Sequence, residues 1–432
     1  MNYREALDYI HGTKKFGSKL GLDNVRELLR LLGNPHNDLK FIHVAGTNGK
    51  GSTSSFIANI LIEGGYKVGL FTSPYLEIFN ERMKINNIDI SDESLAKITC
   101  KVKEKVEEML KKGMNHPTEF EIVTAIAMQY YKEENVDFVV LEVGLGGRYD
   151  STNVIEDSLA SVITTISMDH TDILGDTIGK IAYEKAGIIK NNGLVISYPQ
   201  EKEAQEVIAD VAEKNNARVT IVPTERLEII ETTEFGSRFN FGYKDIRMTN
   251  LEIQLIGAHQ TYNAVTALTT ILALKEEEII SITEEAIKKG LKDTKWSGRL
   301  EVLNRKPTFL IDGAHNIQGI QALKKTLKEI FNYDKLILGV AILADKDVDH
   351  MIEELTPIAD KIVVTEANIF RAMKAEELAT KIRKYNESIT IESNIEKAVQ
   401  KTFDMASEND IIVFSGSLYL IGDVRTIVNN MK

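Results

Sequence analysis

The chain has 432 residues, which exceeds the roughly 100–200 residues of a typical domain and predicts two domains. A composition of 43% hydrophobic and 27% charged residues excludes a disordered or fibrous protein and allows a large buried core. The net charge of −12 argues against a protein that coats nucleic acid or an anionic membrane, so we expect neither as a partner.

Cysteine content and hydropathy indicate the compartment. The single cysteine, Cys100, leaves no internal disulfide and no thiolate metal cluster, which favours a reducing environment. The first ten residues lack the basic start and apolar run of a signal peptide. The longest strongly apolar run, 336–343, is far shorter than the about 20 residues of a membrane span. We therefore expect a soluble cytoplasmic protein.

The first part of the chain alternates strand-like and helix-like patterns. An apolar run at Phe41 leads into a glycine loop, and a helical pattern follows over 53–62. Further strands are expected at 67–71, 137–143 and 160–166, and a helix at 119–131. This alternation predicts a parallel sheet with helices on both faces. The β-rich segment 218–255 predicts a meander appended to the sheet, and a helix is expected from about 260 to 274.

The second part begins after Trp296, where Ser297 and Gly298 are typical of a turn. Four apolar strands, separated by helical patterns, are expected at 308–311, 335–340, 361–364 and 410–414. This arrangement predicts a smaller Rossmann-like α/β domain. We therefore expect domains at 1–296 and 297–432.

The glycine loop after Phe41 is the strongest single motif. Three of the six residues from 46 to 51 are glycine, between a predicted strand and a predicted helix. Backbone N–H groups of such a loop can surround an anion, Lys50 can reach terminal phosphates, and the helix N-terminus adds its dipole. The loop departs from the general P-loop pattern, because Val44 replaces the first glycine and Gly51 separates Lys50 from Ser52. We predict a nucleotide site; the alternative is a tight turn with a surface lysine.

Polar residues follow two of the expected strands. Glu142 ends one of these strands. In P-loop enzymes a carboxylate at such a strand end holds magnesium. The alternative is that Glu142 is an acid that faces the solvent. The glycine-rich loop 144–153 comes next, and such a loop is costly unless it binds something. His170 follows another strand, where a lone histidine is more often a structural partner than a ligand. Lys185 has the spacing of an ordinary surface lysine near a helix end.

Ten ordered motifs resemble those of the folylpolyglutamate synthase/dihydrofolate synthase family, a branch of the Mur-type ATP-dependent amide ligases. The motifs are Leu20-Gly-Leu-Asp-Asn-Val25, Gly46-Thr-Asn-Gly-Lys-Gly-Ser52, Phe71-Thr-Ser-Pro-Tyr-Leu76, Thr118-Glu-Phe-Glu121, Glu142-Val-Gly-Leu-Gly-Gly-Arg148, Asp169-His170, Glu184-Lys-Ala-Gly-Ile188, His259-Gln-Thr-Tyr-Asn263, Trp296-Ser-Gly-Arg-Leu-Glu301 and Asp312-Gly-Ala-His-Asn316. The resemblance implies a P-loop ATP-binding domain of the Mur central type over 1–296, a ligase domain over 297–432 and an active-site cleft between them.

The resemblance also implies a set of site residues. Those that would bind ATP are Asn48, Gly49, Lys50, Gly51, Ser52, Asn263, Arg299 and Asp312. Those that would hold magnesium are Ser73, Glu142, His170 and, if carbon dioxide carbamylates it, Lys185. Those that would lie near the folate-type substrate are Tyr75, Thr118, Glu119, Phe120, Glu121, Arg148, Tyr149 and Asp150. Lys50, Lys185 and His315 would act in catalysis, with His315 helping to close the site.

Two positions depart from the family pattern. Tyr75 replaces the usual histidine, and a tyrosine cannot carry a positive charge near neutral pH. Glu119 stands where bifunctional members often have an aromatic residue, which favours extension of a glutamate tail over dihydrofolate synthesis.

The activity that the resemblance implies is ATP-dependent ligation of L-glutamate to the γ-carboxylate of a folate through an acyl phosphate. The alternative is a bifunctional enzyme that also makes dihydrofolate from dihydropteroate. Two rivals are a ligase for a cell-wall precursor and a P-loop regulator; the Gly144-Leu-Gly-Gly-Arg148 segment argues against the first, and the Glu184 and Asp312 motifs argue against the second. We expect a monomer and leave a potassium requirement, the folate form and the tail length open.

Overall fold

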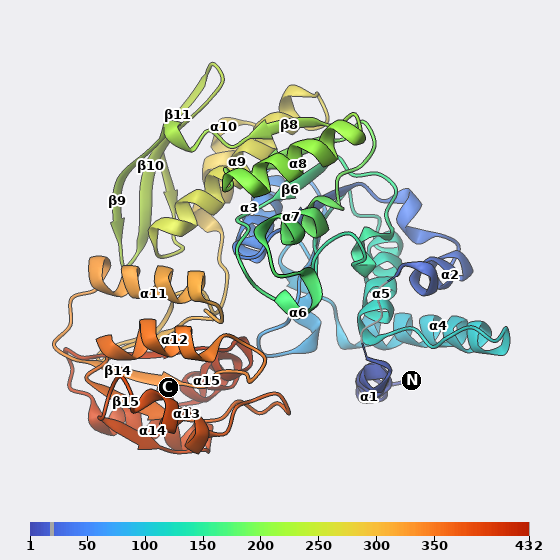
Figure 1. Ribbon diagram of the computed structural model, residues 1–432. Coiled ribbons are helices and arrows are strands. Elements are labelled where there is room, and N and C mark those ends of the chain that lie inside the picture. The colour runs from blue at the N-terminus through green and yellow to red at the C-terminus, as the bar shows by residue number, and fades with distance from the viewer. Residues whose placement is uncertain (18–20, 432) are drawn as a thin grey trace. The chain divides into compact units, whose positions relative to one another are not determined.

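The computed structural model describes residues 1–17 and 21–431 (Figure 1). They form two compact units. The first comprises Met1–Leu227, Phe241–Met248 and Tyr262–Thr294, and the second comprises Glu228–Asn240, Thr249–Thr261 and Lys295–Lys432. Leu20, which opens the first family motif, lies outside the described residues.

The first unit is built on an eight-stranded sheet in its described part. Its strands are β1 (Phe41–Ala45), β2 (Val68–Phe71), β3 (Met83–Ile85), β4 (Ile88–Asp89), β5 (Phe138–Glu142), β6 (Ala160–Ile163), β7 (Leu194–Ser197) and β8 (Arg218–Ile221). They follow the order β4-β3-β2-β5-β1-β6-β7-β8, and all pairs from β2 to β8 are parallel. Val44 of β1 pairs with Glu142 on one side and Val162 on the other. The carboxyl ends of β5, β1 and β6 therefore meet at one edge of the sheet.

Helices of the first unit connect and cover these strands. They are α1 (Tyr3–Gly12), α2 (Asp23–Leu31), α3 (Lys50–Glu63), α4 (Asp92–Lys111), α5 (Glu119–Glu133), α6 (Thr171–Leu174), α7 (Ile178–Ala186), α8 (Lys202–Lys214) and α10 (Glu284–Asp293), together with most of α9 (Ala258–Glu276). One apolar core joins α1, α2, α4 and α5 to the sheet, and another joins α6, α7 and α8 to β6 and β7. These cores position the strand ends that carry the site.

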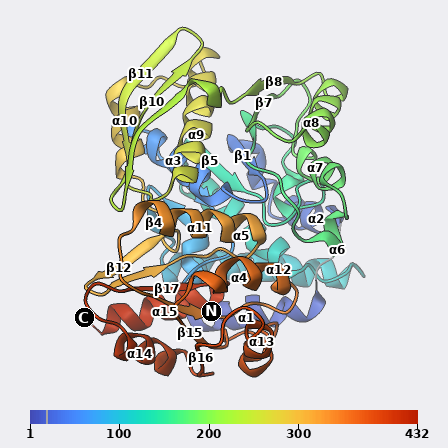
Figure 2. The ribbon, with the colours of Figure 1, turned by 60° about the vertical axis from the view of Figure 1, so that its left-hand side comes forward.

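Helix α3 begins at the glycine loop and is almost completely buried. Its residues 52–61 are all buried, and it packs against α10. Gly290 of α10 permits this contact, because a Cβ there would lie 2.5 Å from Ile60 Cα. Figure 2 shows α3, α9 and α10 grouped together. The C-terminal half of α3 is therefore packed closely against α10.

The β-rich appendage is present, but its first strand has a different place from the one expected. β8 pairs with β7 in parallel in the main sheet, joined to it by α8 as one more strand–helix–strand unit. A separate three-stranded sheet, ordered β11-β10-β9, contains β9 (Leu227–Thr233), β10 (Gly236–Tyr243) and β11 (Ile246–Ile253). Short turns join these strands, as expected of a meander.

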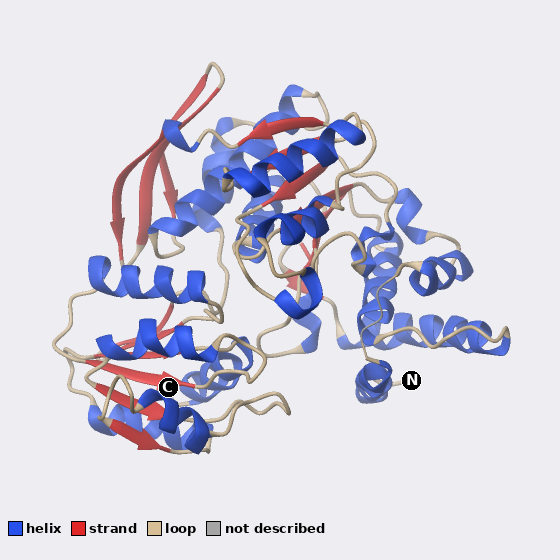
Figure 3. Ribbon diagram, viewed as in Figure 1, coloured by secondary structure: helices blue, strands red, loops and turns tan. Residues whose placement is uncertain are grey.

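The second unit is a doubly wound α/β structure, as the sequence predicts (Figure 3). Its strands are β12 (Glu301–Arg305), β13 (Thr308–Ile311), β14 (Leu336–Val340), β15 (Lys361–Val364), β16 (Ile389–Ile391) and β17 (Ile411–Ser415), in the order β12-β13-β17-β14-β15-β16. Its helices include α11 (Ile317–Ile330), α12 (Val348–Leu355), α13 (Ala375–Ile382), α14 (Ile395–Met405) and α15 (Leu418–Asn430). Only β12 is antiparallel to its neighbour among these described strands. Within the described chain, no helix has both the length and the apolar character that crossing a bilayer requires.

Candidate active site

The glycine loop between β1 and α3 lies at the carboxyl edge of the first sheet. Gly46 and Gly49 have φ values of 155° and 83°, which L side chains rarely adopt. A Cβ on Gly46 would lie 1.8 Å from Thr164 Oγ1, and a Cβ on Gly49 would lie 2.4 Å from Asn263 Oδ1. Only glycine fits at both positions without displacing a neighbour.

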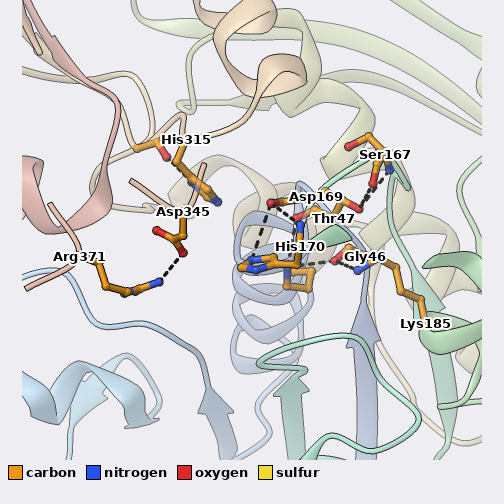
Figure 4. A network of polar contacts seen from close by, with 11 residues as sticks. Gly46, Thr47, Ser167, Asp169, His170, Lys185, His315, Asp345 and Arg371 are labelled. Carbon is orange, nitrogen blue, oxygen red and sulfur yellow. Dashed lines mark hydrogen bonds and ion pairs between the residues drawn. The ribbon is translucent and has the colours of Figure 1, made fainter. Parts of the chain in front are cut away.

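Hydrogen bonds tie the same loop to the segment that follows β6 (Figure 4). The Thr47 N–H donates to Thr165 O at 2.7 Å, and the Thr47 hydroxyl donates to Ser167 O at 3.0 Å. The Thr164 hydroxyl donates to Asn48 O at 2.7 Å. These bonds fix the backbone of the loop in advance, which lowers the conformational cost of binding a ligand there.

Lys50 is the first residue of α3, and its side chain lies over the loop. Its Nζ donates to Gly46 O at 3.0 Å and to Thr47 O at 3.1 Å. Gly51 follows, and Ser52, only 2% exposed, lies in the first turn of the helix. The ammonium group therefore stands beside a loop whose preorganised backbone is suited to phosphate.

Replacement of Gly49 by alanine tests the close contact with Asn263. We expect Gly49→Ala to lower the free energy of unfolding by about 3 kcal/mol, as the sum of left-handed backbone strain and overpacking. Gly113→Ala is the matched control, because Gly113 has a φ of 79° but nothing within 4 Å of the added Cβ. Gly113→Ala should lower the free energy of unfolding only by the left-handed backbone strain, about 1–2 kcal/mol. Urea unfolding measures both, and equal losses would contradict the packing argument.

Lys185 lies near the end of α7 and is buried, with 4% of its surface exposed. The interpretation of this residue as an ordinary surface lysine is therefore wrong. Residues three and four apart share one face of a helix, and Lys185 shares the buried face with Ile181 and Ala182. Its Nζ donates to Gly46 O at 2.9 Å (Figure 4).

Lys185 and Lys50 thus donate to the same carbonyl oxygen, that of Gly46. Burial, and next the positive charge of Lys50, lower the pKa of Lys185 to about 7, while Asp169 and Asp150 oppose the shift. Near neutral pH a large share of this amine is therefore uncharged. An uncharged amine is the form that reacts with carbon dioxide.

Glu142 ends β5 as a buried carboxylate, 5% exposed. The Ser73 N–H donates to Glu142 Oε2 at 3.1 Å, so these two predicted ligands lie together at the sheet edge. A carboxylate and a hydroxyl supply the hard oxygen atoms that Mg²⁺ prefers. The side chains at this point therefore fit a magnesium ion.

His170 lies close to Asp169 after β6. Its backbone N–H donates to Asp169 Oδ1 at 2.9 Å, and its Nε2 lies 3.8 Å from the same oxygen. No three His, Cys, Asp or Glu side chains converge as a metal-binding group in the described chain, and two of the four predicted ligands, Ser73 and Lys185, are of other types. The role of His170 as a magnesium ligand stays a prediction.

Asp150 closes the first part of the glycine-rich segment 144–153, which we call loop 144–150. Its carboxylate accepts hydrogen bonds from the Leu145 N–H at 2.9 Å, the Thr152 N–H at 3.0 Å and the Thr152 hydroxyl at 2.5 Å. Burial raises the pKa of Asp150, whereas these hydrogen bonds lower it. The Asp150 carboxylate therefore holds the conformation of the loop through these hydrogen bonds.

Arg148 and Tyr149 lie on the other part of this loop. The Arg148 guanidinium stands 3.9 Å from the centre of the Tyr183 ring and donates to Tyr183 O at 3.1 Å. Tyr149 is 48% exposed. The loop therefore presents a cation held against an aromatic face and a second, accessible aromatic ring.

The predicted substrate residues on α5 have different surroundings. Thr118 and Glu121 form the capping box of the helix, each side chain accepting from the other's backbone N–H. Phe120 packs against the glycine-rich loop, since a Cβ on Gly144 would lie 2.5 Å from its ring. Glu119 faces the N-terminal segment, 3.4 Å from His11 Nδ1. Phe120 is therefore the residue of this motif that packs on the glycine-rich loop.

Tyr75, in place of the usual histidine, lies beside a cation that the motifs did not reveal. The Arg82 guanidinium stands 5.2 Å from the Tyr75 ring centre and 5.6 Å from that of Phe79. The positive charge that a histidine would carry is therefore supplied near this position by Arg82. In the sequence, the presence of this cation is indicated only by Arg82 itself, a basic residue a few positions after the Phe71 motif.

The second unit brings together Arg299, Asp312 and His315. The buried Asp312 carboxylate accepts from two backbone N–H groups, each at 2.9 Å. Burial raises the pKa of Asp312, and the charge of Arg299 lowers it. His315 Nδ1 lies 2.8 Å from Gly313 O. Asn263, the remaining predicted ATP residue, lies against Gly49 in the first unit.

Comparison with known proteins agrees with this geometry. The family model of the Mur ligase middle domain matches residues 44–271, and that of the Mur ligase, glutamate ligase domain matches residues 298–418. The chain is 39% identical over 430 residues to the dihydrofolate synthase/folylpolyglutamate synthase of Bacillus subtilis (strain 168), with 98% of each chain covered. The chain belongs to the folylpolyglutamate synthase/dihydrofolate synthase family.

Solved structures of this family share the fold. A Mycobacterium tuberculosis folylpolyglutamate synthase complexed with ADP and AMPPCP has a TM-score of 0.91 and 29% identity, with 99% of each chain covered. Escherichia coli FolC in complex with DHPP and ADP has a TM-score of 0.87 and 26% identity, covering 100% of this chain and 98% of that chain. Membership in the folylpolyglutamate synthase/dihydrofolate synthase family makes the chain an ATP-dependent ligase.

Proposed function

We propose that this ligase adds L-glutamate to the γ-carboxylate of a reduced folate and releases ADP and phosphate. The observation that carries the proposal is the glycine loop at the start of α3, which its neighbours hold in place and to which the side chains of Lys50 and Lys185 donate hydrogen bonds. The full-length similarity to synthases of folylpolyglutamate supports the choice of substrate.

The reaction has two balanced steps. A carboxylate oxygen of the folate attacks the γ-phosphorus of ATP, the bond to the β–γ bridging oxygen breaks, and ADP leaves. The amine of L-glutamate then attacks the acyl carbon, the bond to the phosphate oxygen breaks, and the amine loses a proton. Phosphorylation is needed because a free carboxylate has no good leaving group.

The residues of the glycine loop would act in the first step. The backbone of Asn48, Gly49 and Gly51, with Ser52, would bind the phosphates, while Lys50 would neutralise charge on the transferred phosphoryl group. Ser73 and Glu142, with His170, would hold magnesium, which when bound supplies further charge neutralisation. The chain itself supplies no nucleophile.

Roles for the remaining predicted residues follow from their types. Asn263, Arg299 and Asp312 would contact the nucleotide, and His315 would act with them at the reacting groups. We propose that the ligase domain begins at 297, close to Lys295, where the long continuous segment of the second unit starts. Exclusion of water from the site would protect the acyl phosphate from hydrolysis.

The glycine-rich loop 144–150, Phe120 and Tyr75 would hold the pterin side of the substrate. Arg148 offers a cation and Tyr149 an exposed ring, which suit an anionic, aromatic molecule. The surroundings of Glu119, whose carboxylate faces His11, do not discriminate between tail extension and dihydrofolate synthesis. The Bacillus subtilis relative carries both activities in its name, so the bifunctional alternative is kept.

Phosphate release from ATP and magnesium tests the proposal. The assay includes L-glutamate and compares tetrahydrofolate, dihydropteroate and no pterin, with mass spectrometry of the products. We expect release that depends on glutamate and tetrahydrofolate, with a mass gain of one glutamyl unit. Product from dihydropteroate would establish the bifunctional alternative, and hydrolysis indifferent to pterin and glutamate would contradict the proposal.

A further inference from the structure

Three buried side chains form a hydrogen-bonded chain from strand β1 to the glycine-rich loop. His43 Nε2 lies 2.9 Å from Thr152 Oγ1, and the Thr152 hydroxyl donates to Asp150 Oδ1 at 2.5 Å. His43 and Thr152 are 0% exposed and Asp150 is 7% exposed. Neither His43 nor Thr152 belongs to the nucleotide or magnesium residues discussed above. A polar chain in such a dry place is costly unless each member is satisfied.

The number of protons fixes the tautomer of His43. A threonine hydroxyl has one proton, and Thr152 gives it to Asp150. The bond to His43 therefore requires the ring to donate from Nε2, so that Nδ1 carries no proton. Among the described residues Nδ1 has no hydrogen-bond partner, which suits a bare nitrogen better than an N–H donor. Burial also lowers the pKa of His43 well below its usual value, in keeping with a neutral ring.

Asp150 connects these hydrogen-bonded side chains to the backbone of the loop. Its Oδ1 accepts from the Thr152 N–H and hydroxyl, and its Oδ2 accepts from the Leu145 N–H. The two ends of the loop are therefore held by one carboxylate. The orientation of that carboxylate depends on Thr152, whose hydroxyl is in turn oriented by His43.

His43 lies in β1, a central strand whose backbone is hydrogen-bonded on both sides. Its backbone lies between Leu141 of β5 and Ser161 of β6 in the sheet register, so the strand keeps its place whatever side chain stands at 43. Removal of the ring should therefore loosen the glycine-rich loop while leaving the start of the phosphate loop unchanged.

We infer that His43 is a positioning residue that acts through Thr152 and Asp150 to hold loop 144–150 in the geometry that binds the pterin-bearing substrate. The inference rests on the proposed function for the identity of that substrate. His43 would then affect the affinity for the substrate and not the phosphoryl transfer.

Steady-state kinetics of four variants test this role. Thr152→Val and His43→Leu break the hydrogen bonds from His43 through Thr152 to Asp150. Thr152→Ser keeps a hydroxyl group at 152, and His43→Gln keeps an N–H donor at 43. We expect the first pair to raise the KM for tetrahydrofolate about tenfold or more, with the KM for ATP nearly unchanged, and the second pair to stay near wild type. An unchanged folate KM in Thr152→Val, or an equal rise in the KM for ATP, would overturn the inference.

Nuclear magnetic resonance of the wild-type protein provides a test that needs no enzymatic activity. With ¹⁵N-labelled histidine, the His43 signals are identified by their absence in His43→Gln. We expect Nε2 to carry the proton and Nδ1 to be bare at neutral pH. The opposite tautomer, or a doubly protonated ring, would overturn the inference. Absence of folate-dependent activity in wild type would instead refute the proposed function, and the tautomer would still be read independently.

Discussion

Lys50→Ala is expected to reduce phosphate release that depends on folate and glutamate by about a hundredfold to a thousandfold. The Lys50 ammonium is the first cation of α3 and already lies against the carbonyl groups of Gly46 and Thr47. Charge neutralisation on the transferred phosphoryl group is the main catalytic contribution that such a residue makes. A stopped-time phosphate assay at saturating ATP measures the effect as a fall in kcat.

Lys97→Ala is the control for Lys50→Ala. Lys97 lies on the exposed side of α4, where it pairs with Glu133 at 3.2 Å, and its removal changes the same net charge far from the loop. The control should keep wild-type turnover. The far-UV circular dichroism of both variants should match wild type, because the Lys50 side chain bonds to the carbonyl groups of Gly46 and Thr47 in the loop and does not form part of the apolar core. Turnover near wild type in Lys50→Ala would contradict the assignment of the phosphate loop.

Local patterns predicted the parts of the fold and site that depend on neighbours in sequence. The alternation of apolar runs and helical spacing predicted both α/β units, and the glycine loop stood out because its conformation demands glycine at Gly46 and Gly49. Glu142 was located at a strand end because a buried run of known length stops there. These inferences needed no knowledge of what packs against each element.

Burial was the property that sequence spacing predicted least well. Lys185 was misread as exposed, although Ile181 and Ala182 occupy the same helical face and offered a signal. His43 offers a similar signal, because it is a polar residue inside the buried apolar run 41–45. Thr118 and Glu121 have the spacing of a capping box, a structural explanation for a motif that was interpreted only as substrate-binding. The partners of Lys185 and His43, Gly46 and Thr152, lie more than 100 residues away in sequence, so pattern alone could not identify them.

Carbamylation of Lys185 is the second change with a large expected effect. The neutral amine would attack the carbon of carbon dioxide, a C–N bond would form, and one proton would leave, which gives an anionic carbamate. This anion would be attracted to the Lys50 ammonium group, which donates to the same Gly46 O. It would also offer magnesium an oxygen ligand of the kind it prefers. Lys185→Ala should therefore lower ligation about a hundredfold.

Depletion of carbon dioxide should lower the activity of wild type, and bicarbonate should restore it. With ¹³C-labelled bicarbonate, a carbamate signal should appear in wild type and disappear in Lys185→Ala. Lys190 is the matched control, because burial also lowers its pKa, to about 8, but its Nζ donates to Asn153 Oδ1 at 2.8 Å and to Ile155 O at 2.5 Å. A lowered pKa is necessary for carbamylation but not sufficient: the largest charge acting on Lys185 is the cation Lys50, whereas the largest acting on Lys190 is the anion Asp157, which would repel a carbamate. The label should therefore persist in Lys190→Ala, and a signal that survives in Lys185→Ala would show that the carbamate forms elsewhere.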